Sequence, residues 1–316
     1  MSTGISGSSD GGVGGVTMRR IALLASTFLI AGAAACSEPA TDLTSARAGH
    51  KPIVAAEVRQ SDPPPKPPAK LMSVVHYPSA VGAISGYLTP IPEDGQRHPA
   101  IVWVSGGDLA IGDFWSPKPR ENDQSAAAFR ERGVVTFYPS LRGLNGNPGH
   151  SEAFYGEVDD LVAATRWLKQ QPGIDPARVY LGGHSTGGTL VLLASEYSDE
   201  WAGVFSFGPV IDPRLYGDMF PIETKDKPGI KLRAPIHWLA SVRKPTLVIE
   251  GSERGNIVDL NEMKAVSSNP QLHFVAGAGC DHFTILRPAS EIIADAIHAG
   301  VVDALWTGEK FTNVCG

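Results

Sequence analysis

The chain has 316 residues, of which 42% are hydrophobic and 19% are charged. This length and composition are those of a globular protein with a substantial apolar core, and they exclude both a small disulfide-held scaffold and a largely disordered chain. The 27 Lys and Arg residues against 33 Asp and Glu residues give a net charge of −6, which argues against a nucleic acid partner.

Residues 1–35 have the pattern of an upstream extension followed by an export signal. Met18 opens a segment in which two arginines precede the mostly apolar residues 21–35. That run is too short for a transmembrane helix but suits a signal peptide. Cys36 follows two alanines and resembles the lipidated cysteine of a bacterial lipobox. We therefore expect an exported protein, either a bacterial lipoprotein attached to a membrane surface through a lipid on Cys36, or a periplasmic or secreted protein.

Residues 36–70 are rich in proline and include the run PPPKPP at 63–68. Such a composition favours extended polyproline geometry, so we expect a tether between the lipid and the folded domain.

Residues 71–316 form the predicted catalytic domain, in which strand and helix patterns alternate. This alternation predicts an α/β fold with a mostly parallel eight-stranded sheet and helices on both faces. Residues 212–242 interrupt the alternation and predict a small cap insertion. The predicted strands are 72–76, 82–88, 100–104, 134–138, 179–183, 203–207, 246–250 and 272–275, and the predicted helices are 125–132, 157–170, 186–196, 260–267 and 289–305.

Ser185 lies in a glycine-rich turn between a predicted strand and a predicted helix. The surrounding sequence GHSTGG at 183–188 contains the G-x-S-x-G pattern in the strand-turn-helix context of a nucleophile elbow. Gly183 and Gly187 leave room for this sharp turn. We predict that Ser185 is a nucleophile.

A serine nucleophile requires a histidine base that is itself oriented by an acid, and after an elbow serine these follow in the order acid, then histidine. His282, in the loop after the last predicted strand, is the predicted base. The predicted acid is Glu253, in the turn after strand 246–250, and Glu250 at the end of that strand is the alternative.

Backbone N–H groups next to the serine predict an oxyanion-binding site. Thr186 follows the nucleophile directly, while Gly106 and Gly107 follow strand 100–104. Four aromatic residues are candidates for the lining of an acyl pocket, namely Phe207, Tyr216, Phe220 and Trp238.

The two remaining cysteines, Cys280 and Cys315, are a possible disulfide pair in an oxidising compartment, and two unrelated thiols are the alternative. We see no metal-binding spacing and no cofactor motif, and hydrolysis by this route needs neither.

Together these residues resemble an α/β-hydrolase. Within that superfamily the chain is most similar to the catalytic domain of prolyl oligopeptidase-type serine hydrolases, over about residues 98–305. The resemblance implies Ser185 as nucleophile, His282 as base, and Gly107 with Thr186 near the oxyanion. It rests on YPSLRG at 138–143, YGEVDD at 155–160, GHSTGG at 183–188, PIHW at 235–238 and DHF at 281–283.

The chain departs from this family in two respects. Relatives usually carry Asp three places after the glycine of the acid turn, where this chain has Arg254. The peptidases also carry a large β-propeller that filters peptide substrates, which the proline-rich residues cannot replace. The second departure favours an esterase over a peptidase.

We therefore expect a serine hydrolase that cleaves carboxylic ester or small amide bonds through an acyl-enzyme, acting on a small-molecule ester or peptide. One alternative is a prolyl oligopeptidase-like exopeptidase. The other is a catalytically inactive binding lipoprotein that has lost activity through the shifted acid.

Overall fold

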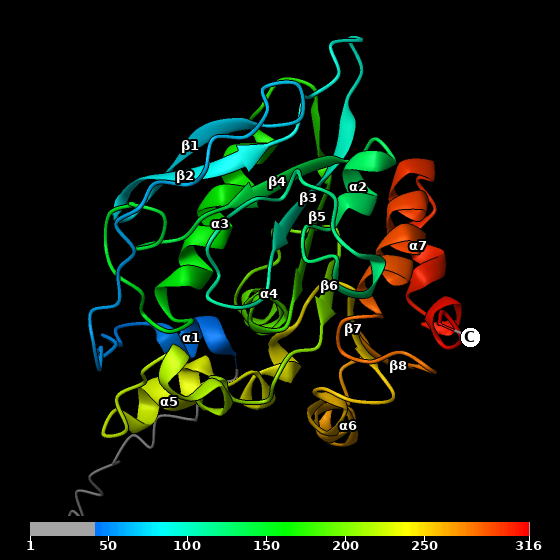
Figure 1. Cartoon of the computed structure of the whole chain (residues 1–316). Helices are drawn as coiled ribbons and strands as arrows, with labels where there is room; N and C mark the ends of the chain where they lie inside the picture. Colours follow the sequence, from blue (N-terminus) through cyan, green and yellow to red (C-terminus); the bar gives the residue numbers. More distant parts are fainter. Residues whose placement is uncertain (1–41, 316) are drawn as a thin grey trace, which may run out of the picture. The chain divides into compact units, whose positions relative to one another are not determined.

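The computed structural model describes residues 42–315, which contain one eight-stranded sheet (Figure 1). The strand order is β1-β2-β4-β3-β5-β6-β7-β8. β1 and β2 form an antiparallel hairpin that joins β4, and every pairing from β4 to β8 is parallel, which confirms the predicted sheet. The strands are β1 Ser73–Ser79, β2 Gly82–Leu88, β3 His98–Val104, β4 Val135–Pro139, β5 Ile174–His184, β6 Val204–Phe207, β7 Thr246–Gly251 and β8 Leu272–Gly277.

Helices cover both faces of the sheet, with α3 and α4 on one side and α2 and α7 on the other (Figure 1). The α-helices are α1 Leu43–Arg47, α2 Ala127–Glu131, α3 Gly156–Lys169, α4 Thr186–Tyr197, α5 Lys227–Arg233, α6 Ile257–Val266 and α7 Leu286–Ala299. The short 3-10 helices are η1 Arg120–Asn122, η2 Pro213–Met219, η3 Pro235–His237, η4 Leu239–Ser241, η5 Val302–Leu305 and η6 Glu309–Phe311. No described helix combines the length and the apolar character that a membrane crossing requires.

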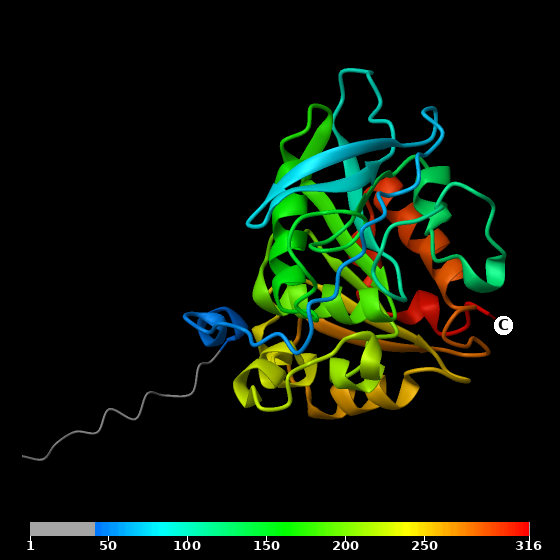
Figure 2. The same ribbon diagram turned by 60° about the vertical axis from the view of Figure 1, so that its left-hand side comes forward.

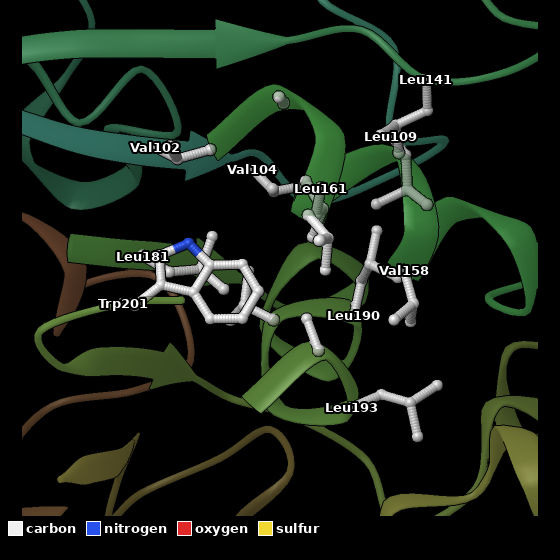
Figure 3. Close-up of a cluster of buried hydrophobic side chains, with 14 of the residues drawn as sticks. Val102, Val104, Leu109, Leu141, Val158, Leu161, Leu181, Leu190, Leu193 and Trp201 are labelled. Carbon is white, nitrogen blue, oxygen red and sulfur yellow. The ribbon is translucent and has the colours of Figure 1, made fainter. Parts of the chain in front are cut away.

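Alternation along the central strands explains why both faces are covered. In β3, Val102 and Val104 face the cluster formed with α3 and α4, which also contains Leu181 of β5 (Figure 3). Ile101 and Trp103 belong to the opposite cluster, which contains residues of α2 and α7. Because successive side chains point to opposite faces and both sets are apolar, the strand must be buried on both sides.

The last predicted helix is shorter than expected. α7 ends at Ala299, and a separate turn, η5, follows it, whereas the sequence predicted one helix over 289–305. Gly300 has φ 71°, the left-handed conformation that commonly ends a helix, and its N–H donates to carbonyls of the last turn. The predicted helix therefore stops at this glycine.

The expected tether is wrong for the described part of residues 36–70, because residues 42–70 pack on the catalytic domain. Leu43 is fully buried, and its N–H donates to Ser241 Oγ at 3.1 Å. Arg47 is 7% exposed, and its guanidinium donates to the carbonyl of Tyr155 and to Asp159. These contacts anchor α1 before the proline-rich part begins. Met18, Cys36 and the predicted export signal lie outside the described residues.

Residues 48–68, here called the strap, run across the loops at the carboxyl edge of the sheet (Figure 2). Isolated bridges join Val54 to Ile222 of the insertion and Val58 to Ser151. The Gln60 N–H donates to the Gly143 carbonyl at 2.7 Å, and Tyr87 Oη donates to the Pro65 carbonyl at 2.6 Å. An extended chain has no internal hydrogen bonds, so these loop groups satisfy part of its backbone and hold it in place.

Residues 212–242 form an insertion of short helices, η2, α5, η3 and η4, between β6 and β7. It packs through a cluster of three aromatic rings in which Phe154 lies 5.9 Å from Tyr216 and 4.7 Å from Phe220. The insertion therefore lies against the loop that follows β4.

Candidate active site

Ser185 occupies a strained turn between β5 and α4. Its φ of 57° and ψ of −115° are unfavourable for a residue with a side chain. The Ser185 N–H donates to the Phe207 carbonyl at 2.8 Å, which fixes the turn against β6. A Cβ on Gly183 would lie 2.6 Å from the Gly187 carbonyl oxygen, so only glycine fits there. The predicted elbow geometry is present.

The His282 imidazole lies against a buried carboxylate. Its Nδ1 donates to Glu250 Oε2 at 2.8 Å, and Glu250 is fully buried. The same oxygen accepts the Asn256 N–H at 3.0 Å, and Oε1 accepts the Gly251 N–H at 2.7 Å. Three donors thus hold the carboxylate, and the imidazole Nε2 is left to meet another group.

Glu253, the predicted acid, does not meet the imidazole. Its side chain is exposed and accepts a hydrogen bond from Ser252 Oγ at 3.0 Å. The turn after β7 brings Gly255 against the His282 side chain, so the glutamate at the strand end already reaches the ring. The alternative residue, Glu250, takes the position expected for Glu253.

Hydrogen bonds and a disulfide restrain the loop that carries His282. Asp281 Oδ1 accepts the N–H groups of Phe283 and Thr284 at 3.1 and 3.0 Å. Cys280 and Cys315 form a disulfide across 35 positions, as the first of the two sequence alternatives expected. Both features restrict the loop immediately next to the imidazole.

The glycine pair after β3 approaches the elbow closely, but its two amides are not equivalent. Thr186 Oγ1 donates to the Gly107 carbonyl at 2.8 Å, and Gly107 has φ 81°. The Gly106 N–H donates to Gln124 Oε1 at 3.2 Å. Gly106 is therefore already engaged, and the amides of Thr186 and Gly107 are the remaining candidates for binding an oxyanion.

Tyr216 of the insertion lies beside the serine. Its hydroxyl is 2.8 Å from Thr189 Oγ1, one helical turn after Ser185. Burial raises the pKa of Tyr216, and hydrogen bonding with Thr189 and Ser185 opposes that rise. Its ring stacks on Phe154, with Phe220 nearby, so an aromatic wall flanks the nucleophile.

The side chains of the other two aromatic candidates are packed in the core or in the insertion. Phe207 is fully buried in β6 and packs on Trp103, which makes it part of the core. Trp238 is buried within the insertion, where its Nε1 donates to the Lys231 carbonyl at 2.8 Å.

Two motifs behind the family resemblance meet in a buried ion pair. Arg142 of YPSLRG donates through Nε to Asp160 of YGEVDD at 2.9 Å, and both side chains are almost fully buried. This pair ties the loop after β4 to α3. These residues support the site and lie apart from the reacting groups.

Sequence reasoning missed Gln124 and the role of His184. His184 is fully buried, with Nδ1 2.9 Å from Gln124 Oε1 and Nε2 donating to the His282 carbonyl at 2.8 Å. Burial, assisted by nearby His282, lowers the pKa of His184 to about 3. Within residues 42–315, no group of three or more His, Cys, Asp or Glu side chains is arranged to hold a metal ion.

Comparison with known proteins finds a family match over part of the chain. Residues 121–267 match the Prolyl oligopeptidase family. A relative described as the Uncharacterized peptidase YtmA of Bacillus subtilis is 25% identical over 224 residues, which are 67% of this chain and 84% of that protein. These two matches support a prolyl oligopeptidase-type α/β-hydrolase domain.

Solved structures share the fold of this chain. An esterase from Pyrobaculum calidifontis superposes with a TM-score of 0.53 and 19% identity, over 74% of this chain and 87% of the esterase. A puromycin-hydrolyzing peptidase from Mycobacterium tuberculosis superposes with a TM-score of 0.58 and 19% identity, over 74% of this chain but only 40% of the peptidase. The predicted fold is confirmed, and the family match supports a hydrolase of the serine type.

Proposed function

We propose that the protein hydrolyses carboxylic esters of small molecules through an acyl-enzyme formed on Ser185. The 2.8 Å hydrogen bond from His282 Nδ1 to Glu250, at the sheet edge that presents Ser185 in a strained elbow, carries this proposal. It supplies the orienting acid that the serine and histidine require.

The reaction follows from the positions of the protons. Because His282 Nδ1 holds the hydrogen that it donates to Glu250, Nε2 carries a lone pair. As Ser185 Oγ bonds to the carbonyl carbon, Nε2 takes the hydroxyl proton and returns it to the departing alcohol when the C–O bond breaks. Water then attacks the acyl-enzyme by the same route, which releases the acid and restores the serine.

Backbone amides stabilise the negative charge that forms on the carbonyl oxygen. We assign Thr186 and Gly107 to this role, because the Gly106 N–H is held by Gln124. Removing one such donor typically costs about 3 kcal/mol of transition-state stabilisation. Tyr216, which is partly exposed beside the serine and backed by the buried rings of Phe154 and Phe220, would contact the acyl group.

The strap favours small substrates. It crosses the loops after β3 and β4 and the insertion, all of which surround the serine end of the sheet. The Gln60 side chain donates to Asp108 at 2.7 Å, directly after the glycine pair. A segment held across these loops would restrict the binding of an extended polypeptide on that side.

Peptide-bond hydrolysis is the second candidate. The match to the Prolyl oligopeptidase family and the likeness to a puromycin-hydrolyzing peptidase favour it. Both candidates use the same triad, so only the substrate separates them.

Labelling with a fluorophosphonate tests the chemistry, and turnover tests the substrate. The wild-type protein should be modified on Ser185, and Ser185→Ala should not; an unlabelled wild type would reject both hydrolase candidates and leave the inactive binding protein. p-Nitrophenyl acetate and butyrate should be hydrolysed faster than aminoacyl anilides. Substantial anilide turnover with negligible ester turnover would replace the esterase with the peptidase.

We also propose that the protein is exported and that Cys36 is lipidated. The disulfide between Cys280 and Cys315 supports an oxidising compartment. When the full chain is produced in a bacterium, Cys36→Ala should move the protein from the membrane fraction to the soluble exported fraction. Recovery of both proteins from the soluble fraction would overturn lipidation, and recovery from the cytoplasm would overturn export.

A further inference from the structure

Gln124 lies between the oxyanion loop and the nucleophile elbow. It follows η1, and Trp103 Nε1 donates to its main-chain carbonyl at 3.1 Å. Its side-chain Oε1 accepts the Gly106 N–H at 3.2 Å and lies 2.9 Å from His184 Nδ1. The main chain of Gln124 is thus fixed by the core, and its side-chain oxygen contacts both Gly106 and His184.

His184 continues this connection to the loop of the base. Its Nε2 lies 2.8 Å from the main-chain oxygen of His282, and because a carbonyl only accepts, Nε2 must carry a hydrogen. The rings of His184 and His282 lie 4.4 Å apart between centroids. One chain of contacts therefore runs from Gly106 through Gln124 and His184 to the backbone of His282.

The residues that make these contacts are closely packed around Gly106. A Cβ on Gly106 would lie 3.1 Å from Ser185 Cβ, and 3.2 Å from both Gln124 Oε1 and His184 Nδ1. A movement of either side chain is therefore transmitted to the loop that faces the serine. Interiors packed this closely transmit displacement rather than absorb it.

The two side chains form an uncharged link that consists of one hydrogen bond to Gly106 and one close contact between Gln124 and His184. Burial and the neighbouring His282 keep His184 neutral near pH 7, with a pKa of about 3. Gln124 Oε1 accepts the Gly106 N–H, and it also lies 2.9 Å from His184 Nδ1, which carries a lone pair when Nε2 holds the hydrogen. Gln124 and His184 are therefore joined by close packing and not by a hydrogen bond. No charge is added beside His282, whose imidazolium must form during the reaction.

We propose that Gln124 and His184 are positioning residues that hold the Gly106–Gly107 loop and the His282 backbone in one fixed relation to Ser185. This inference rests on the proposed function, because it assigns these residues to the alignment of that triad. Neither residue touches the reacting atoms in this role; both act through the groups that do.

Three variants test the connection. Gln124→Met removes both side-chain contacts at nearly constant length, His184→Phe removes both ring contacts, and the double variant removes the whole chain. Each single change should lower kcat and the fluorophosphonate labelling rate constant by about 10- to 100-fold, as small misplacements in active sites do, with KM within about threefold of wild type. The double variant should have a kcat and a labelling rate constant no more than about threefold below those of the less active single variant, because the effects of residues in one network are not additive.

Gln171→Met is the matched control, since it makes the same exchange at a part-buried glutamine in a different region. Gln171 Nε2 donates to the Trp167 carbonyl at 2.9 Å at the end of α3. Its thermal midpoint should fall about as much as that of Gln124→Met, while its labelling rate constant and kcat stay at the wild-type value.

Two results would overturn the inference while leaving the proposed function intact. One is wild-type labelling and turnover by folded Gln124→Met, and this result decides the matter alone if His184→Phe does not fold. The other is a double variant whose loss equals the product of the single losses. By contrast, a wild-type protein that is not labelled on Ser185 overturns the proposed function and this inference with it.

Discussion

Glu250→Gln replaces one oxygen of the carboxylate that meets His282 with an amide nitrogen. The two carboxylate oxygens accept from three N–H groups, with Gly251 on Oε1 and with Asn256 and His282 on Oε2. An amide has only one oxygen, so one set of these donors must face an NH2 group. Since Glu250 is fully buried, water does not replace the lost acceptor.

Either amide orientation damages the site. With oxygen toward His282, the NH2 group opposes the Gly251 N–H, and a buried unsatisfied donor costs about 1–3 kcal/mol of stability. With NH2 toward His282, the ring must accept at Nδ1 and carry its hydrogen on Nε2, so it cannot take the serine proton. That wrong tautomer lowers kcat by about 10⁴-fold in a comparable triad, which corresponds to about 5.5 kcal/mol in the activation barrier.

Steady-state hydrolysis of p-nitrophenyl acetate, with thermal unfolding as a check on folding, measures both effects. Glu253→Gln is the matched control, because it makes the same exchange three positions away on an exposed side chain. It should behave like wild type in kcat and in thermal midpoint. If Glu250→Gln keeps kcat within threefold of wild type, or if Glu253→Gln is the inactive variant, the assignment of the acid is refuted.

Two further predictions concern stability. Glu196 is fully buried in α4 and both its oxygens lack a partner within residues 42–315, so desolvation raises its pKa well above 4.5. The native state therefore keeps a proton that the unfolded chain loses above pH 4.5, so the free energy of unfolding falls as pH rises. Glu196→Met should remove up to about 1.4 kcal/mol of this loss per pH unit, so it should stabilise the protein more at pH 7 than at pH 5. Equal stabilisation at the two pH values in urea unfolding would contradict this prediction. Loss of the disulfide in Cys315→Ala frees a loop of 35 positions and should lower the free energy of unfolding by about 3–4 kcal/mol. A reductant should bring wild type to the same midpoint, and a wild type insensitive to reductant would argue against the bond.

The elbow and the histidine could be predicted from sequence because their signals are local or topological. Ser185 stands between an apolar strand and an apolar helix, with glycines where a Cβ would collide with backbone. His282 follows the last parallel strand, and the carboxyl ends of parallel strands meet at one edge. Neither prediction required knowledge of where a segment distant in sequence packs.

The acid could not be predicted in the same way. Two glutamates stand three positions apart, and the choice between them depends on where β7 ends and how residues 251–256 turn. Glu250 reads as the last residue of an apolar strand, where a buried carboxylate is unusual without partners. That unusual burial was the available signal, but the partners, His282 and the turn amides, are defined only by the fold.

The packing of residues 42–70 was missed for a related reason. The proline content predicts extended geometry, and the strap is largely extended, but composition does not say what it lies against. The Leu43 N–H is hydrogen-bonded to Ser241, 198 positions away, and Val54 forms a β-bridge with Ile222. Contacts at such separation leave no periodic pattern in the local sequence.

The groups around Ser185 are each held from more than one direction, which suits a reaction that depends on fixed dipoles. The oxyanion loop is bound by Gln124 at Gly106 and by Gln60 at Asp108. The base loop is bound by His184 and by the disulfide of Cys280. Donors that are already oriented do not have to reorganise as charge develops, and this preorganisation is the largest single contribution in many hydrolases. Ester hydrolysis here should therefore require no closing movement before the chemical step.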